Sequence, residues 1–342
     1  PGCSKLRVDF RNDLYFVKPA CRYHRYCDQP KIVASKMSQE PNTYSALGEV
    51  GAVSEKRSLW QRLMLDLRKA PMTARFGMIV ILGYIILAVF APILSPYGEA
   101  EVFPEPYAAW SAEHVFGTDQ IGRDIFSRMI FGARNTVGIA VATTLMAFII
   151  GGSLGLAAAI NQSWLDQFLS RAVDGLMAIP SLIFALVLLS IFGSTVTNLI
   201  LIIAVLDSTR VFRLTRAVSL NVVVMDYVEA ARLRGEGLWW IMRREILPNI
   251  MPPLIAEFGL RFCFVFLTIA ALSFLGVGIQ PPTADWGSMV RENASLIMFA
   301  QYDIKAGLTP LLPAAAIALL TVAINFVVDW FLHKTSGLRD EQ

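Results

Sequence analysis

Long apolar segments limit most strongly what this chain can fold into. The hydrocarbon core of a bilayer is about 30 Å thick, so a helix needs about 20 mostly apolar residues to cross it. The chain is 55% hydrophobic and 17% charged, whereas a soluble domain has roughly 25% charged residues. We therefore predict an all-α, polytopic membrane protein. Five segments are long and apolar enough to span a bilayer: residues 76–94, 136–160, 175–192, 252–275 and 308–332.

A sixth segment, residues 196–212, is weaker, and its assignment depends on charge. Cytoplasmic loops are enriched in Lys and Arg. Residues 54–75 hold six Lys or Arg against two acids, residues 95–116 hold four Glu without Lys or Arg, and residues 207–249 hold seven Arg against five acids. The N-terminus and residues 207–249 are therefore expected in the cytoplasm, with an even number of spans between them. Counting 196–212 gives six transmembrane helices with both termini cytoplasmic.

The other parts of the chain follow from this topology. Residues 37–75 are expected to form a cytoplasmic tail, 76–332 the transmembrane domain, and 333–342 a second cytoplasmic tail. Residues 1–36 mix Cys, Arg, Tyr and His without periodicity. We interpret them as an extension that need not be native, from upstream mistranslation or a cloning artefact. The two long external loops are expected at residues 95–135 and 276–307.

Several function classes lack the residues they need. The sequence has no CxxC spacing and its three His lie far apart, whereas a structural zinc site needs clustered ligands. We therefore expect no metal site. The net charge of +3 is too small to indicate a nucleic-acid partner. No HExxH motif and no pair of neighbouring His indicates a membrane enzyme, so we expect no catalytic residues.

The cytoplasmic segment at residues 226–249 is long enough for two short helices. Glu229 falls in the first turn of the first helix, where a carboxylate suits the positive helix end. Gly235 is expected to end or bend this helix, because glycine readily adopts positive φ. A second, amphipathic helix follows, and Pro248 is expected where the chain leaves that helix for the next span.

This segment resembles the EAA loop of ABC importer permeases, which has Glu-Ala-Ala, three residues, Gly, about ten residues and Ile-Leu-Pro. In that family the loop docks on the ATP-binding subunit. Arg234 and Glu236 depart from the residues that often flank the glycine. The resemblance implies coupling roles for Glu229, Ala230, Ala231, Gly235, Ile246, Leu247 and Pro248.

Two further segments resemble the dipeptide/oligopeptide/nickel group of the same family. Residues 114–124 read HVFGTDQIGRD, and residues 273–282 read SFLGVGIQPP with Trp-Gly following at 286–287. Together they indicate the second, C-type permease subunit, with the type I importer fold over residues 70–340. The expected cargo is a di- or oligopeptide crossing the bacterial inner membrane. Nickel chelates, glutathione, opines and oligosaccharides stay open as alternatives.

The resemblance implies a set of partners. They are a second, B-type permease that forms a heterodimer with this chain, two ATP-binding subunits of D- and F-type, a periplasmic binding protein and membrane lipid. The chain contains no GxxxxGK[ST] motif, so ATP and Mg²⁺ are expected on the partner ATPases and no cofactor on this chain. The chain is therefore expected to be a non-catalytic subunit. An ion-coupled secondary transporter is the main rival, although no internal repeat is evident.

Charged residues inside the spans are candidates for the translocation path, because a mid-bilayer charge usually faces a partner or a cavity. Glu257 and Arg261 stand four residues apart in the fifth span, and they either form a structural pair or line the path. Asp207 and Arg210 raise the same question. Contact with the binding protein and a structural cap for the external half are the alternatives for Asp119, Arg123 and Asp124. Gln280 and Trp286 are further candidates for external contact with the binding protein.

Two smaller features concern packing and anchoring. Gly151, Gly152 and Gly155 have the spacing of a small-residue face for close helix packing. Arg213 and Arg216 lie three residues apart at the cytoplasmic end of the fourth span. They are expected to anchor that end at the membrane surface, with lipid phosphates or acidic groups of the ATPase as alternative partners.

Overall fold

The computed structural model describes residues 70–335. The expectations for residues 1–36, for nearly all of the tail 37–75 and for most of the tail 333–342 lie outside the described residues. Within residues 70–335 there is no β-strand, only an isolated bridge between Thr118 and Asp124. The helices are α2 (Met72–Leu94), α3 (Ile125–Ile160), α4 (Trp164–Met177), α5 (Ser181–Phe192), α6 (Val196–Val223), α7 (Asp226–Leu233), α8 (Leu238–Ile241), the π-helix η2 (Met242–Ile246), α9 (Leu247–Phe274), α10 (Trp286–Asn293), the 3₁₀ helix η3 (Ala294–Gln301), α11 (Ile304–Leu308) and α12 (Leu311–Thr335).

Four of the predicted spans have a matching helix. The helices Met72–Leu94, Ile125–Ile160, Leu238–Phe274 and Ile304–Thr335 are long and apolar enough to cross a membrane. Three of them contain the segment predicted from hydropathy, and the helix Leu238–Phe274 covers all but the last residue of the predicted segment 252–275. The second span begins eleven residues before the predicted start at residue 136, because the end of the first external loop is helical from Ile125.

The predicted third span, residues 175–192, is wrong as a single straight helix. The structure has α4 and α5 meeting at 89°. Pro180, just before α5, lacks an N–H and pushes the residue before it out of the helical region. With 12 residues, α5 is only about 18 Å long, too short to cross alone. The bent pair therefore makes one span at most.

The weak fourth span lies within α6, which has 28 residues and is about 42 Å long. Its length is sufficient for a crossing, but four charged residues (Asp207, Arg210, Arg213 and Arg216) interrupt its apolar character. The described residues therefore give four clear spans, or five if the bent pair counts as one; α6 stays the predicted sixth, so the count of six is approximate.

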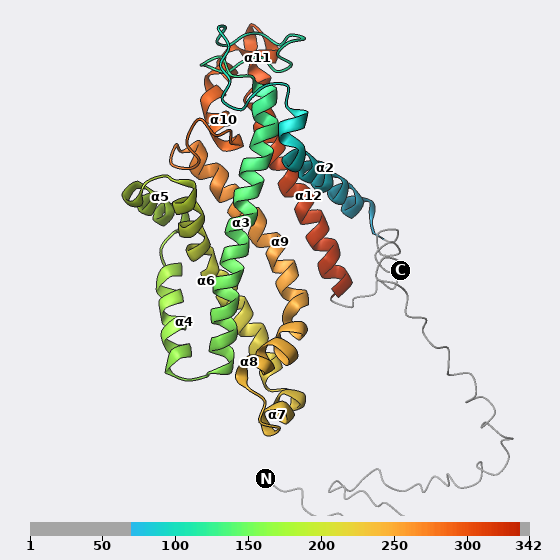
Figure 1. Ribbon diagram of the computed structural model, residues 1–342, viewed down its shortest axis with the longest axis vertical. Helices are drawn as coiled ribbons and strands as arrows, with labels where there is room; N and C mark the ends of the chain where they lie inside the picture. Colours follow the sequence, from blue (N-terminus) through green and yellow to red (C-terminus); the bar gives the residue numbers. More distant parts are fainter. Residues whose placement is uncertain (1–69, 336–342) are drawn as a thin grey trace, which may run out of the picture. The chain divides into compact units, whose positions relative to one another are not determined.

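The predicted coupling segment and the predicted external loops lie at opposite ends of the helix bundle (Figure 1). The long helices α3, α6 and α9 pack on one another, and α2 packs against α12. The Tyr84 hydroxyl of α2 donates to the Ala316 carbonyl of α12 at 2.9 Å. At one end lie α7 and α8, and at the other lie α10, α11 and the loop that precedes α3. This separation agrees with the predicted cytoplasmic and external sides.

Close packing between α3 and α6 depends on two glycines. A Cβ on Gly151 would overlap the Ser208 carbonyl, and a Cβ on Gly155 would press on the backbone of Phe212. Gly152 faces open space. The predicted small-residue face is confirmed for Gly151 and Gly155. It is wrong for Gly152, because Gly152 points away from α6.

Candidate coupling site and translocation path

The first cytoplasmic helix, α7, ends in a left-handed turn. Gly235 has φ +80°, so the expectation that it ends this helix is confirmed. Its N–H donates to the Arg232 carbonyl at 3.0 Å, and the Glu236 N–H donates to the Ala231 carbonyl at 3.2 Å. These bonds occupy carbonyls that the helix end leaves without partners. A sharp turn then leads into α8.

The second cytoplasmic helix does not end at Pro248. It continues from α8 through the π-turn η2 into α9, so the expectation that Pro248 marks an exit from this helix is wrong. The Leu247 N–H donates to the Met242 carbonyl, five residues back. A proline ring collides with the carbonyl four residues earlier in a regular α-helix. We attribute the wider turn to the need to accommodate Pro248.

One face of the α7–α8 hairpin is buried against the helix bundle. Ala231 and Ile246 are fully buried, and they belong to an apolar cluster that also includes Leu156 of α3 and Val223 of α6. The cluster fixes the hairpin to the ends of three long helices. Its other members are Val228, Ile241, Ile250 and Leu254.

The opposite face of the hairpin is exposed. Glu229, Ala230 and Gly235 are exposed, as are Leu247 and Pro248 at the start of α9. The sequence-derived set of seven coupling candidates is therefore divided into two buried and five exposed residues. Large apolar side chains that the sequence reasoning did not select as candidates are also exposed here, namely Leu233 at 83% and Trp239 at 71%. Their apolar character on solvent-facing positions of α7 and α8 is the signal that identifies them.

Charged residues of α6 and α9 meet between the two helices. Arg261 Nε donates to Glu257 Oε1 at 2.6 Å, so the predicted pair forms. Arg261 also lies 3.8 Å from Asp207 Oδ1, which is 3.3 Å from Arg210. The structure brings together two acids and two arginines that the sequence suggested only as separate pairs. Their role in the translocation path stays a prediction.

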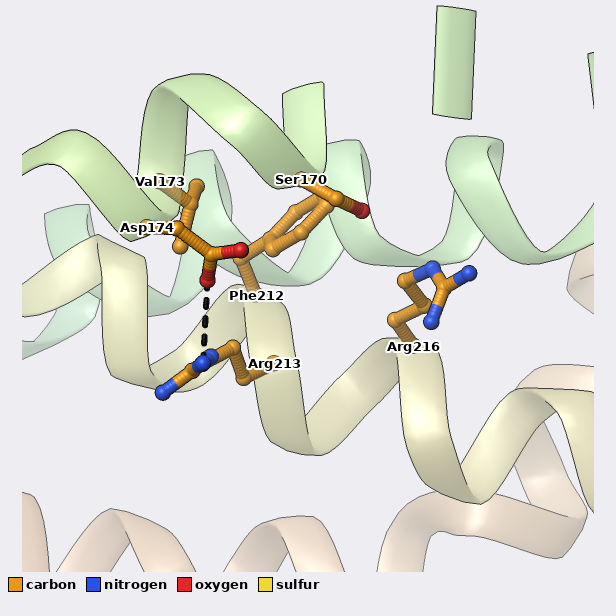
Figure 2. Close-up of a pocket in the computed structure, with 6 residues that line it drawn as sticks. All are labelled: Ser170, Val173, Asp174, Phe212, Arg213 and Arg216. Carbon is orange, nitrogen blue, oxygen red and sulfur yellow. Dashed lines mark hydrogen bonds and ion pairs between the residues drawn. The ribbon is translucent and has the colours of Figure 1, made fainter. Parts of the chain in front are cut away.

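Two arginines near the cytoplasmic end of α6 face α4 (Figure 2). Arg213 pairs with Asp174 at 2.9 Å, and both side chains are more than half exposed. Arg216 forms a bidentate pair with Asp166 at 2.5 and 2.7 Å. These pairs flank an open pocket of about 260 Å³. The arginines thus hold α4 against α6 in addition to any anchoring at the membrane surface.

At the external end, three of the predicted contact residues are buried. Asp119 pairs with Arg123 at 2.6 Å, and Asp119 Oδ1 accepts the Arg123 N–H. Asp124 accepts the Ser127 N–H at 2.7 Å as the cap of α3 and lies 2.9 Å from His114 Nδ1. The side chains of Asp119, Arg123 and Asp124 are 1–4% exposed. This geometry favours the structural interpretation over contact with a binding protein.

Arg128 and Glu292 complete this buried charge cluster, and the sequence reasoning did not select either. Glu292 Oε2 accepts from Arg123 at 2.8 Å and from Arg128 at 3.3 Å. Arg128 is 1% exposed. The cluster joins the first external loop and α3 to α10. The sequence signal that could have identified Arg128 is its position as an arginine at the start of a long apolar helix.

The last external loop packs on α3 through Trp286, another predicted contact residue. Its side chain is 1% exposed, and Nε1 donates to the Met129 carbonyl at 3.0 Å. Asp285 accepts from the Ser288 N–H and the Thr136 hydroxyl, and burial raises the pKa of this carboxyl. Gln280 is exposed, so it alone of the five external candidates has a surface available to a partner.

These features define a class: a helical, multi-pass membrane protein with a helical hairpin fixed to one end of its long helices. The chain belongs to the family of binding-protein-dependent transport system inner membrane components, whose pattern matches residues 151–334. Residues 58–109 match the N-terminal transmembrane domain of oligopeptide transport permease C. The chain is thus a C-type permease of an ABC importer, located in the inner membrane.

Relatives from three bacteria agree with this assignment. The dipeptide transport system permease protein DppC of Alkalihalophilus pseudofirmus is 33% identical, covering 89% of this chain and 94% of that protein. A di/tripeptide permease of Pseudomonas aeruginosa is 35% identical over 77% of this chain and 85% of its own length. The glutathione transport system permease protein GsiD of Pectobacterium atrosepticum is 32% identical over 83% and 89%.

Proposed function

We propose that this permease moves di- or oligopeptides across the inner membrane and receives its driving force at the α7–α8 hairpin. The proposed cargo is supported by the relatives whose names specify dipeptides or di- and tripeptides. Glutathione is the second candidate, because one relative is named for glutathione transport. Glutathione is itself a small peptide, so both candidates present an ammonium group and carboxylates.

The proposed partners are a B-type permease, two ATP-binding subunits of D- and F-type, and a periplasmic binding protein. ATP and Mg²⁺ bind to the ATP-binding subunits, and this chain binds no cofactor. The exposed face of the hairpin is the surface offered to one ATP-binding subunit. Its apolar side chains, Leu233 and Trp239, are of the kind that fills pockets at protein interfaces.

The buried face of the hairpin explains how a displacement of the hairpin by an ATP-binding subunit would reach the membrane-spanning helices. Ala231 and Ile246 sit in the apolar cluster with residues of α3, α6 and α9, so the hairpin moves with these helices as one body. The helix Leu238–Phe274 is continuous, so displacement of α8 is passed along α9 to the charged residues near Arg261. Rigid-body motion of packed helices is a common form of such transitions.

Mass spectrometry can identify the cargo. The cognate binding protein is purified together with the importer, and its bound ligand is released and sequenced. We expect short peptides. Recovery of a nickel chelate, an opine or an oligosaccharide would contradict the proposed cargo while leaving the coupling role intact.

Cysteine cross-linking tests the coupling surface. Ala230→Cys places a thiol on the exposed face, and Ala231→Cys places one on the buried face of the same helix. We expect cross-links from position 230 to an ATP-binding subunit and none from position 231. Equal cross-linking at the two positions, or none at position 230, contradicts the docking role.

A further inference from the structure

A small cavity lies between α5, α6 and α9, beside the charged residues of α6 and α9. Its polar lining consists of Ser181, Asp207, Arg210 and Thr268. The volume is about 20 Å³, which is enough for one group the size of a water molecule. The cavity therefore suits the end of a ligand rather than a whole peptide.

Asp207 lines this cavity, and one of its carboxylate oxygens lacks a hydrogen-bond donor. It is 6% exposed, and only its Oδ1 lies near arginine nitrogens, at 3.3 Å from Arg210 and 3.8 Å from Arg261. Among the described residues, Asp207 Oδ2 is buried and has no hydrogen-bond partner. A buried carboxylate oxygen without a donor is costly, so a ligand that brings a donor gains affinity there.

Charge balance restricts the kind of ligand. Asp207, Glu257, Arg210 and Arg261 sum to zero. A simple cation would add an uncompensated charge inside the membrane, which is unfavourable. A zwitterion adds none. Arg210 is 41% exposed at its side chain, so part of its guanidinium is available to the carboxylate of the same ligand.

We propose that Asp207 Oδ2 binds the ammonium group of the transported peptide, while Arg210 neutralises its carboxylate. This inference rests on the proposed peptide cargo. It assigns a specificity-determining carboxylate to the path at the junction of α5, α6 and α9. A peptide with a blocked amino group would leave Asp207 without its donor and would bind less well there.

A thiol reporter inside the cavity tests this directly. In the assembled importer, Thr268→Cys is labelled with methyl methanethiosulfonate, which adds only a methylthio group, and modification at position 268 is quantified by mass spectrometry, so the native cysteines need not be removed. The probes are glycylglycine and N-acetylglycylglycine. We expect glycylglycine to slow labelling and the acetylated probe to have little effect. The reporter is then combined with Asp207→Asn, Asp207→Glu or, as a control outside the cavity, Asp174→Asn.

Protection should weaken by roughly tenfold or more in Asp207→Asn, as expected for loss of a hydrogen bond to a charged group. It should return in Asp207→Glu and persist in Asp174→Asn. Equal protection by both probes, protection that survives Asp207→Asn, or a thiol that is never labelled would overturn the proposal. Peptide uptake by wild type is measured in parallel. Absent uptake contradicts the cargo, whereas normal uptake without Asp207-dependent protection contradicts this site alone.

Discussion

Replacement of Gly235 provides a quantitative test of the hairpin. Its φ of +80° lies in the left-handed region, which costs an L-residue about 1–2 kcal/mol. A Cβ at this position meets no atom within 4 Å, so the cost of Gly235→Ala is conformational, without a steric clash. At about 1.4 kcal/mol per factor of ten, the native turn should lose about 5- to 30-fold in population relative to open forms.

Hydrogen exchange measures this loss. The amides at positions 235 and 236 donate to the carbonyls of Arg232 and Ala231. We expect their protection to fall by about 5- to 30-fold in Gly235→Ala. Their protection should fall less in Gly235→Asn, because asparagine tolerates the left-handed region. ATP hydrolysis stimulated by the loaded binding protein should fall in the same order.

Gly237 offers a matched control two residues away. Its φ is −69°, and a Cβ there also meets nothing. Gly237→Ala should therefore leave both protection and stimulated ATP hydrolysis near wild-type values. Wild-type protection in Gly235→Ala, or an equal loss in Gly237→Ala, would refute the reasoning that the left-handed turn shapes the docking surface.

Three further experiments, two of them with a matched control substitution, test other parts of the structure. Gly151→Leu should destabilise the permease by about 1–3 kcal/mol through overpacking, whereas Gly152→Leu should change stability by less than about 0.5 kcal/mol; thermal unfolding of the purified complex distinguishes them. Arg128→Met should cost about 3–5 kcal/mol, because two buried acids would then share Arg123 and one negative charge would be uncompensated; the exposed Arg213→Gln should cost less than about 1 kcal/mol, measured the same way. Trp239→Ala should weaken binding of the ATP-binding subunit by about 2 kcal/mol without lowering the unfolding temperature, and unchanged binding would remove Trp239 from the interface.

The sequence predicted well those spans whose positions depend on hydropathy alone. Helices α2 and α12 are apolar over most of their length, so their positions follow from the bilayer requirement. The third span was misjudged because α4 is polar on one face and Pro180 bends the chain before α5. Asp166 and Asp174 of α4 form ion pairs with Arg216 and Arg213 of α6. Hydropathy does not register this pairing between helices.

The turn at Gly235 was predictable from the sequence, but the orientation of the neighbouring coupling candidates was not. Spacing identified Gly235, and its positive φ follows from local chemistry. The division between buried Ala231 and exposed Ala230 depends on how the hairpin meets the bundle, which spacing does not specify. Likewise, the i,i+4 rule predicted the Glu257–Arg261 pair, but their approach to Asp207 depends on the packing of α6 against α9.

Reconstituted transport is the most direct test of the central claim. The complete importer is placed in proteoliposomes with ATP on the side of the ATP-binding subunits and the binding protein with labelled dipeptide on the other. We predict that the dipeptide accumulates only when ATP is hydrolysed, and that accumulation falls in Gly235→Ala and persists in Gly237→Ala. Accumulation driven by an ion gradient without ATP would contradict the account.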